Sequence, residues 1–207
     1  IGDDVEVCVM ETPGRGSRLS ELPLGRAAEI GAHAARAVLP FTDRAFAFFG
    51  HDLGALAMFE CVRRLRLEVA PMPIHLFVSA AIAPDVHYFS PLHHLPSQHF
   101  RAELKKLGID STLPERTLRA DCAALSSYSY GRELALEVPL TAIAAERDGF
   151  VPLTGVRGWF RHTRREGSLL VRPGGHPWTE ADRPMLLEIG NKLLGKVMRR
   201  EDAAAQP

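Results

Sequence analysis

The chain has 207 residues, of which 46% are hydrophobic and 24% are charged, and its 25 basic and 25 acidic residues leave a net charge of zero. These are values of a globular protein long enough for one domain with a sizeable core. A chain without net charge has no general attraction to nucleic acid or to an anionic membrane. We therefore expect a single domain, residues 1–207, that is a soluble monomer and binds neither nucleic acid nor membrane.

The three cysteines, Cys8, Cys61 and Cys122, lie in apolar stretches without Cys-x-x-Cys spacing. This spacing predicts neither a zinc site nor a disulfide framework. We expect buried free thiols, which are typical of a reducing compartment. No run approaches the ~18 apolar residues of a membrane span, and no signal segment is recognisable at the start, so a cytoplasmic location is predicted.

The predicted elements alternate between strands and helices. In chain order they are a strand at 5–10, a helix at 24–39, a strand at 45–49 followed by a helix, a strand at 74–79, a helix at 117–130, a strand at 139–145, a helix at 156–162, a strand at 168–171 and a helix at 181–198. The run at 74–79 is almost continuously apolar, as in a strand buried on both faces of a parallel sheet. This order predicts an α/β fold with a mostly parallel central sheet and helices on both faces.

The segment from 83 to about 116 interrupts the alternation. It contains four prolines and four histidines around one helical piece at 98–107. An insertion of this kind beyond a strand end commonly covers a site, so we predict a lid. The adjacent His93 and His94 point apart and no chelating spacing accompanies them, so we expect no metal.

The sequence around Asp52 indicates a sharp turn from strand to helix. Gly50-His-Asp-Leu-Gly54 follows an apolar run, and from Ala55 the apolar residues recur at helical spacing. This is the pattern of a nucleophile elbow, with aspartate where serine is common. Asp52 is accordingly a covalent nucleophile, a general base or an inert residue, and an aspartate that caps the helix is an alternative interpretation.

Two further candidates follow later strands. Asp148 comes after the strand at 139–145, with Glu146 as a rival acid, and His176 comes after the strand at 168–171. The carboxyl ends of parallel strands share one edge of the sheet. Asp52, Asp148 and His176 also stand in the chain order nucleophile, acid, histidine of an α/β-hydrolase. An ordinary turn aspartate and an ordinary loop histidine are the alternatives for the last two.

The chain resembles the type II thioesterases of polyketide and nonribosomal peptide assembly lines, which are α/β-hydrolases, over nearly its whole length. The matching pieces are Thr12-Pro-Gly-Arg-Gly-Ser-Arg18, Phe49-Gly-His-Asp-Leu-Gly-Ala-Leu56, Pro73-Ile-His-Leu-Phe-Val-Ser79, His94-Leu-Pro96, Leu118-Arg-Ala-Asp121 and Pro173-Gly-Gly-His176. The resemblance implies hydrolysis of acyl chains from the phosphopantetheine arm of an acyl or peptidyl carrier protein in antibiotic biosynthesis, without a cofactor.

Carried over by position, the resemblance places Asp52 where the family has its nucleophilic serine, Asp148 as the acid and His176 as the base. It makes the backbone N–H of Leu53 an oxyanion donor. His51 and Arg15 are assigned to the substrate entrance.

Two departures keep other functions open. Serine is replaced by Asp52, and the family's opening strand, with the second oxyanion donor, is expected upstream of Ile1. Gly-His-Asp-x-Gly also resembles the elbow of haloalkane dehalogenases and epoxide hydrolases, in which an aspartate attacks a saturated carbon. The alternatives to a thioesterase-like hydrolase are therefore such an aspartate-nucleophile hydrolase, or a non-catalytic carrier-protein binder with an inert elbow.

Overall fold

The computed structural model describes residues 5–86, 90–109 and 112–175, and isolated positions between 184 and 195. The chain forms two compact units, Glu11–His176 and the pair of segments Ile1–Met10 and Pro177–Pro207. All elements named below belong to the first unit. The helix predicted at 181–198 lies mostly outside the described residues. His176 also lies outside them.

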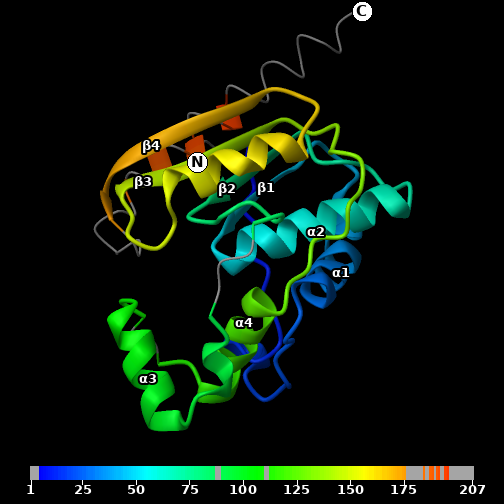
Figure 1. The fold of residues 1–207 in the computed structure, drawn as a ribbon. Helices are drawn as coiled ribbons and strands as arrows, with labels where there is room; N and C mark the ends of the chain where they lie inside the picture. The colour runs from blue at the N-terminus through cyan, green and yellow to red at the C-terminus, as the bar shows by residue number, and fades with distance from the viewer. Residues whose placement is uncertain are drawn as a thin grey trace, which may run out of the picture. The chain divides into compact units, whose positions relative to one another are not determined.

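The first unit is built on a four-stranded parallel sheet in the order β1-β2-β3-β4 (Figure 1). Its strands are β1 (Ala47–His51), β2 (His75–Ser79), β3 (Leu140–Arg147) and β4 (Gly167–Gly175). The helices are α1 (Ala27–Val38), α2 (Leu53–Leu67), α3 (Ser97–Lys106), α4 (Glu115–Ser126) and α5 (Leu153–Arg157), with short 3₁₀ turns η1 (Gly16–Arg18), η2 (Leu39–Phe41), η3 (Leu92–His94) and η4 (Gly158–His162). The predicted α/β class is confirmed.

The main core lies between the sheet and the helices α2, α5 and η4. All five residues of β2 are buried, as its continuous apolar run predicts. Phe59 of α2 and Trp159 of η4 meet edge to face, with ring centroids 5.5 Å apart, and both pack in one apolar cluster with Val78 and Ala142. Trp159 also donates its indole N–H to the carbonyl of Ala81, so its polar atom is satisfied in the core.

Two expectations fail at the edges of this architecture. Residues 5–10 form no strand: Val9 is 88% exposed and the segment has no regular structure. Their alternation of apolar and polar residues is typical of a strand. A strand also needs hydrogen bonds to a neighbouring strand, and periodicity does not predict whether such a neighbour is present. Cys8 is exposed and only Cys61 is fully buried, with Cys122 intermediate.

The predicted lid segment shares an apolar cluster with α4. Phe100 and Leu104 of α3 pack with Leu118 of α4. Arg119 of α4 lies over the Phe100 ring and donates to the carbonyls of residues 93 and 95, at 2.7 and 2.8 Å. The helical piece predicted at 98–107 is confirmed as α3, whereas the helix predicted at 117–130 is α4 and ends at Ser126.

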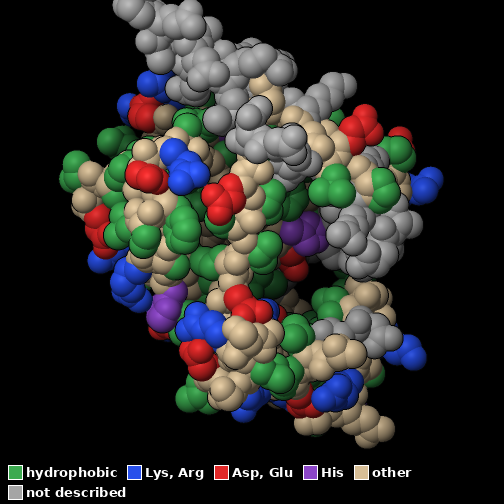
Figure 2. Space-filling view, turned by 180° about the vertical axis from the view of Figure 1, so that it is seen from behind, with side chains coloured by type: hydrophobic (Ala, Val, Ile, Leu, Met, Phe, Trp, Pro, Cys, Tyr) green, Lys and Arg blue, Asp and Glu red, His purple; other side chains and the backbone are tan. Residues whose placement is uncertain are grey.

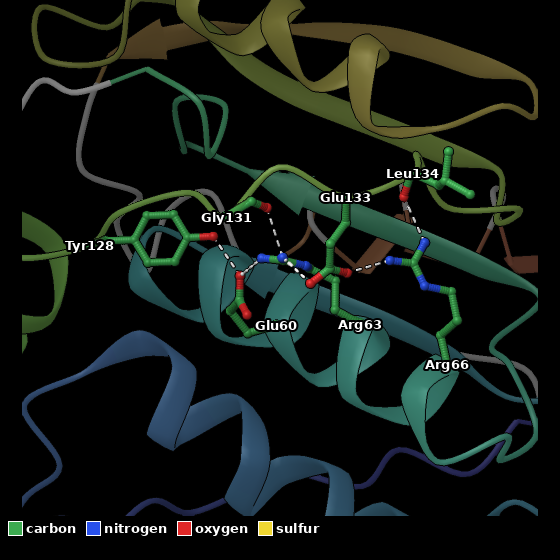
Figure 3. Close-up of polar contacts among 7 residues, drawn as sticks. All are labelled: Glu60, Arg63, Arg66, Tyr128, Gly131, Glu133 and Leu134. Atoms are coloured by element: carbon green, nitrogen blue, oxygen red, sulfur yellow. Dashed lines mark hydrogen bonds and ion pairs between the residues drawn. The ribbon is translucent and has the colours of Figure 1, made fainter.

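The chain after α4 leaves the helical path because it is bound to α2 (Figure 3). Arg63 of α2 donates to Glu60 at 2.6 Å, to Glu133 at 2.5 Å and to the carbonyl of Gly131 at 2.9 Å. Tyr128 donates its hydroxyl to Glu60 at 2.5 Å. Residues 128–133 are therefore held along α2 by contacts that helical periodicity does not reveal.

The charge on Arg63 is stabilised although its side chain is only 9% exposed. Burial opposes this charge, but Glu133 and Glu60 outweigh burial and raise the pKa of the guanidinium. Burial, together with the hydrogen bond to Glu60, raises the pKa of Tyr128. Removing Arg63 would leave Glu60, whose side chain is 13% exposed, without its cation, whereas Glu133 would keep its ion pair with Arg66.

We expect Arg63→Met to lower the free energy of unfolding by about 3 kcal/mol, because Glu60 and Glu133 lose their shared cation. Arg64→Met is the matched control. Arg64 is the next residue of the same helix, and its pair with Glu68 is half exposed, so the loss there should be below about 0.5 kcal/mol. Urea denaturation of both variants checks this, and equal losses would contradict the role given to Arg63.

Val69 follows α2 in a left-handed conformation, with φ 54°, while Ala70 donates its N–H to the carbonyl of Leu65. This position after a helix favours glycine, and a β-branched residue is strained there. Val69 is 92% exposed, so its side chain contributes little packing. We expect Val69→Gly to raise the free energy of unfolding by about 1 kcal/mol, and Val69→Ala to give a smaller gain by the same urea measurement.

Candidate active site

The turn between β1 and α2 has the geometry of a nucleophile elbow. Asp52 adopts φ 51° and ψ −122°, a conformation that L-residues rarely adopt. Its N–H donates to the carbonyl of Ser79 on β2 at 2.9 Å, and its own carbonyl accepts from Ala55 at 3.0 Å. A Cβ on Gly50 would lie 2.5 Å from the Cα of Ala55, so the close approach of strand and helix requires glycine there.

The carboxylate of Asp52 does not cap α2. The residue occupies the N-cap position but makes no side-chain capping hydrogen bond. The interpretation of Asp52 as a simple capping aspartate is therefore wrong. Leu53 begins α2, and the first N–H groups of a helix have no acceptor within the helix. The structure thus places Leu53 where an oxyanion donor is expected, although that role stays a prediction.

Asp148 lies directly after β3, at the same edge of the sheet. Its Oδ1 accepts the N–H groups of Phe150 and Val151, each at 2.9 Å, so the carboxylate is fixed by its own turn. The preceding residue, Arg147, pairs with Gly175, the last residue of β4. The strands before Asp148 and before the sequence position of His176 therefore end side by side. The triad itself stays a prediction, because His176 is outside the described residues.

The rival acid and the two entrance residues have distinct surroundings. Glu146 is exposed on β3, beside an irregularity in the pairing with β4. The imidazole Nδ1 of His51 lies 3.2 Å from the hydroxyl of Ser79, which is fully buried. His51 is therefore tied to β2 next to the elbow, and Arg15 contacts α4 instead.

Arg15 joins two of the motifs found in the sequence. It forms an ion pair with Asp121 of α4 and donates to the hydroxyl of Thr12 at 3.1 Å. Asp121 was part of a matching motif but had no predicted role. Burial raises the pKa of Asp121, and Arg15 offsets part of that effect. The matching motif drew attention to Asp121, but it could not identify the partner, because Arg15 is more than a hundred positions away in the sequence.

Cys122 connects this ion pair with the elbow. Burial raises the pKa of its thiol to about 11, and the charges of Asp121 and Asp52 add to the effect. The thiol is therefore protonated at neutral pH and is a poor nucleophile. Ala124 of α4 packs in a cluster with Ala57, against which Leu53 also packs, so α4 forms part of the surroundings of the elbow.

Within the ranges 5–86, 90–109 and 112–175, no group of three or more metal-ligating side chains could hold an ion. In the same part of the chain, no helix has the length and apolar character that crossing a bilayer requires. The face in Figure 2 shows acidic and basic side chains interspersed, in line with the balanced composition.

Comparison with known proteins agrees with the geometry. The thioesterase domain family matches residues 1–193. The gramicidin S biosynthesis protein GrsT of Aneurinibacillus migulanus is 32% identical over 208 residues, covering 94% of this chain and 80% of that protein. The thioesterase PikA5 of Streptomyces venezuelae is 34% identical over 185 residues, covering 83% of this chain and 65% of that protein.

A solved structure gives the same result for the fold. RedJ, a thioesterase from the prodiginine pathway of Streptomyces coelicolor, superposes with a TM-score of 0.81 at 33% identity, covering 92% of this chain and 80% of that one. The predicted α/β-hydrolase fold is confirmed, as is the resemblance to type II thioesterases.

We expect Asp52→Gly to raise the free energy of unfolding by about 1 kcal/mol, because glycine adopts φ 51° without strain. Asp52→Asn, which keeps the size and the strain, should change it by less than about 0.5 kcal/mol. Urea denaturation distinguishes them. A loss of stability in the glycine variant would mean that the carboxylate, rather than the backbone, maintains the turn.

Proposed function

The chain belongs to the thioesterase family, and from this premise we propose that it hydrolyses acyl thioesters carried on the phosphopantetheine arm of an acyl or peptidyl carrier protein. The reaction serves polyketide or nonribosomal peptide biosynthesis, and the protein acts as a cytoplasmic monomer. Relatives named for gramicidin S biosynthesis and for a thioesterase support this proposal.

The observation that carries the proposal is the strained backbone conformation of Asp52 and the absence of a capping hydrogen bond from its carboxylate. The residue adopts a backbone conformation that costs stability. Such strain is typical of functional residues. The position after β1 also lies at the carboxyl edge of a parallel sheet, where ligands bind in open α/β folds.

We propose that Asp52 acts as a general base on water. The water oxygen attacks the thioester carbonyl carbon while its proton passes to Asp52, and the N–H of Leu53 stabilises the oxygen that becomes negative. The carbon–sulfur bond then breaks, and the thiolate takes a proton from the imidazolium form of His176, which Asp148 orients. Asp52 then passes the proton that it took from water to His176, so both groups return to their starting states. The products are a free acid and a thiol.

Direct attack by Asp52 on the acyl carbon is the competing route. It would form a mixed anhydride, which is more reactive than the starting thioester, so an intermediate of this kind gains little for a carboxylate nucleophile. Attack on water avoids that species and uses the same residues.

A single-turnover reaction in ¹⁸O-labelled water, quenched early and analysed by mass spectrometry, tests for the covalent route, because only that route leaves an acyl adduct on Asp52 or label in its carboxylate. With an acyl-N-acetylcysteamine thioester as substrate, we expect label in the released acid and none in the Asp52 carboxylate, as mass spectrometry of the peptide would show. Label in Asp52 would establish covalent catalysis instead. Absence of any turnover would contradict the proposed function and favour a carrier-protein binder.

The matching variants test the assignments. Asp52→Asn and Asp148→Asn should each lower kcat/KM by roughly 100-fold or more. Glu146→Gln, a nearby exposed carboxylate, is the control and should stay within about twofold of wild type. A larger loss in Glu146→Gln than in Asp148→Asn would reverse the choice of acid.

A further inference from the structure

Residues 12–19, which we call the entrance loop, are bound to one face of α4. Thr117 donates its buried hydroxyl to the carbonyl of Gly14 at 3.0 Å, and Arg116 donates to the carbonyl of Leu19 at 2.6 Å. Asp121, one helical turn beyond Thr117, holds Arg15. Gly14 has φ 84°, and a Cβ there would lie 3.1 Å from the Thr117 hydroxyl, so this position favours glycine and the loop lies in close contact with α4.

The same helix packs against the beginning of α2. Ala124 of α4 lies in an apolar cluster with Ala57 and Ile30, and Leu53, the residue after Asp52, packs against that cluster. A movement of α4 would therefore displace the first turn of α2, which contains the predicted oxyanion donor.

Asp121 depends on a single partner. Its Oδ2 contacts Arg15, whereas its Oδ1 is buried and has no hydrogen-bond partner among the described residues. A buried carboxylate with one oxygen unsatisfied is costly, and the cation of Arg15 is what compensates it. Loss of Arg15 would thus favour rearrangement of α4 rather than leave it in place.

We propose that Asp121 is a positioning residue for the reaction: by holding Arg15, it fixes the entrance loop and α4 as one wall beside Asp52. This inference rests on the proposed function, since it assigns the wall to the thioester site. Displacements of about 1 Å in such supporting elements can change rates by large factors. Asp121 does not touch the reacting atoms in this assignment.

Kinetics of variants test the proposal with hexanoyl-N-acetylcysteamine as substrate. Arg15→Met and Asp121→Asn should each lower kcat/KM about tenfold, mostly through kcat, and the double variant should lose no more than either single variant, because one shared contact is removed. Arg15→Lys, which keeps the charge, should recover part of the activity. Unchanged kcat in the single variants, or fully additive losses in the double variant, would overturn the proposal.

The exposed pair Arg64–Glu68 supplies the control, because it is also an ion pair but lies on the surface of α2. Arg64→Met and Glu68→Gln should leave kcat/KM within about twofold of wild type. An equal loss there would mean that removal of any ion pair impairs the enzyme.

Amide hydrogen exchange separates this proposal from the proposed function. In Arg15→Met we expect faster exchange in the entrance loop, in α4 and at residues 53–57 together, whereas Arg64→Met should leave all three unchanged. Faster exchange confined to the loop would overturn the coupling of loop, helix and elbow. Should the wild-type protein hydrolyse no thioester, the proposed function fails, while exchange still decides whether the pair holds this wall.

Discussion

The turn at Asp52 is the constraint on which the rest of the site depends. A parallel sheet brings the ends of its strands to one edge, but a reactive side chain is useful there only if the backbone holds it out of the following helix. Gly50 allows helix and strand to approach, the N–H of Asp52 is bound to β2, and the residue accepts an unfavourable φ of 51°. The surrounding contacts maintain this conformation.

Helix α2, which begins at this turn, also holds the segments around it in place. Near its first turn it packs with α4, through Leu53, Ala57 and Ala124. Two to three turns later Arg63 binds the chain that returns from α4 to the sheet. Helix α4 and the chain that follows it are therefore both held against α2, the helix that begins at the elbow.

The sequence predicted the α/β class and most strands because their signals are local. The apolar run of β2 and the glycines around Asp52 each determine structure within a few residues. The end of α4 was predicted too late, since Tyr128 is helix-compatible by pattern but is bound to Glu60 on α2. The segment at 5–10 failed for the converse reason: alternation was present without a neighbouring strand.

The candidate site likewise has residues that local sequence signals predict and residues whose contacts only the fold reveals. Asp52 and Asp148 were predicted from their places after strands, and their roles stay predictions. The pairing of Arg15 with Asp121 depends on folding across the chain and carried no local signal. The influence of Asp121 and Asp52 on the thiol of Cys122 has a practical consequence. Because two carboxylates and burial all suppress ionisation of this thiol, its alkylation rate as a function of pH is a native probe of the electrostatic potential at the elbow, available without any introduced label.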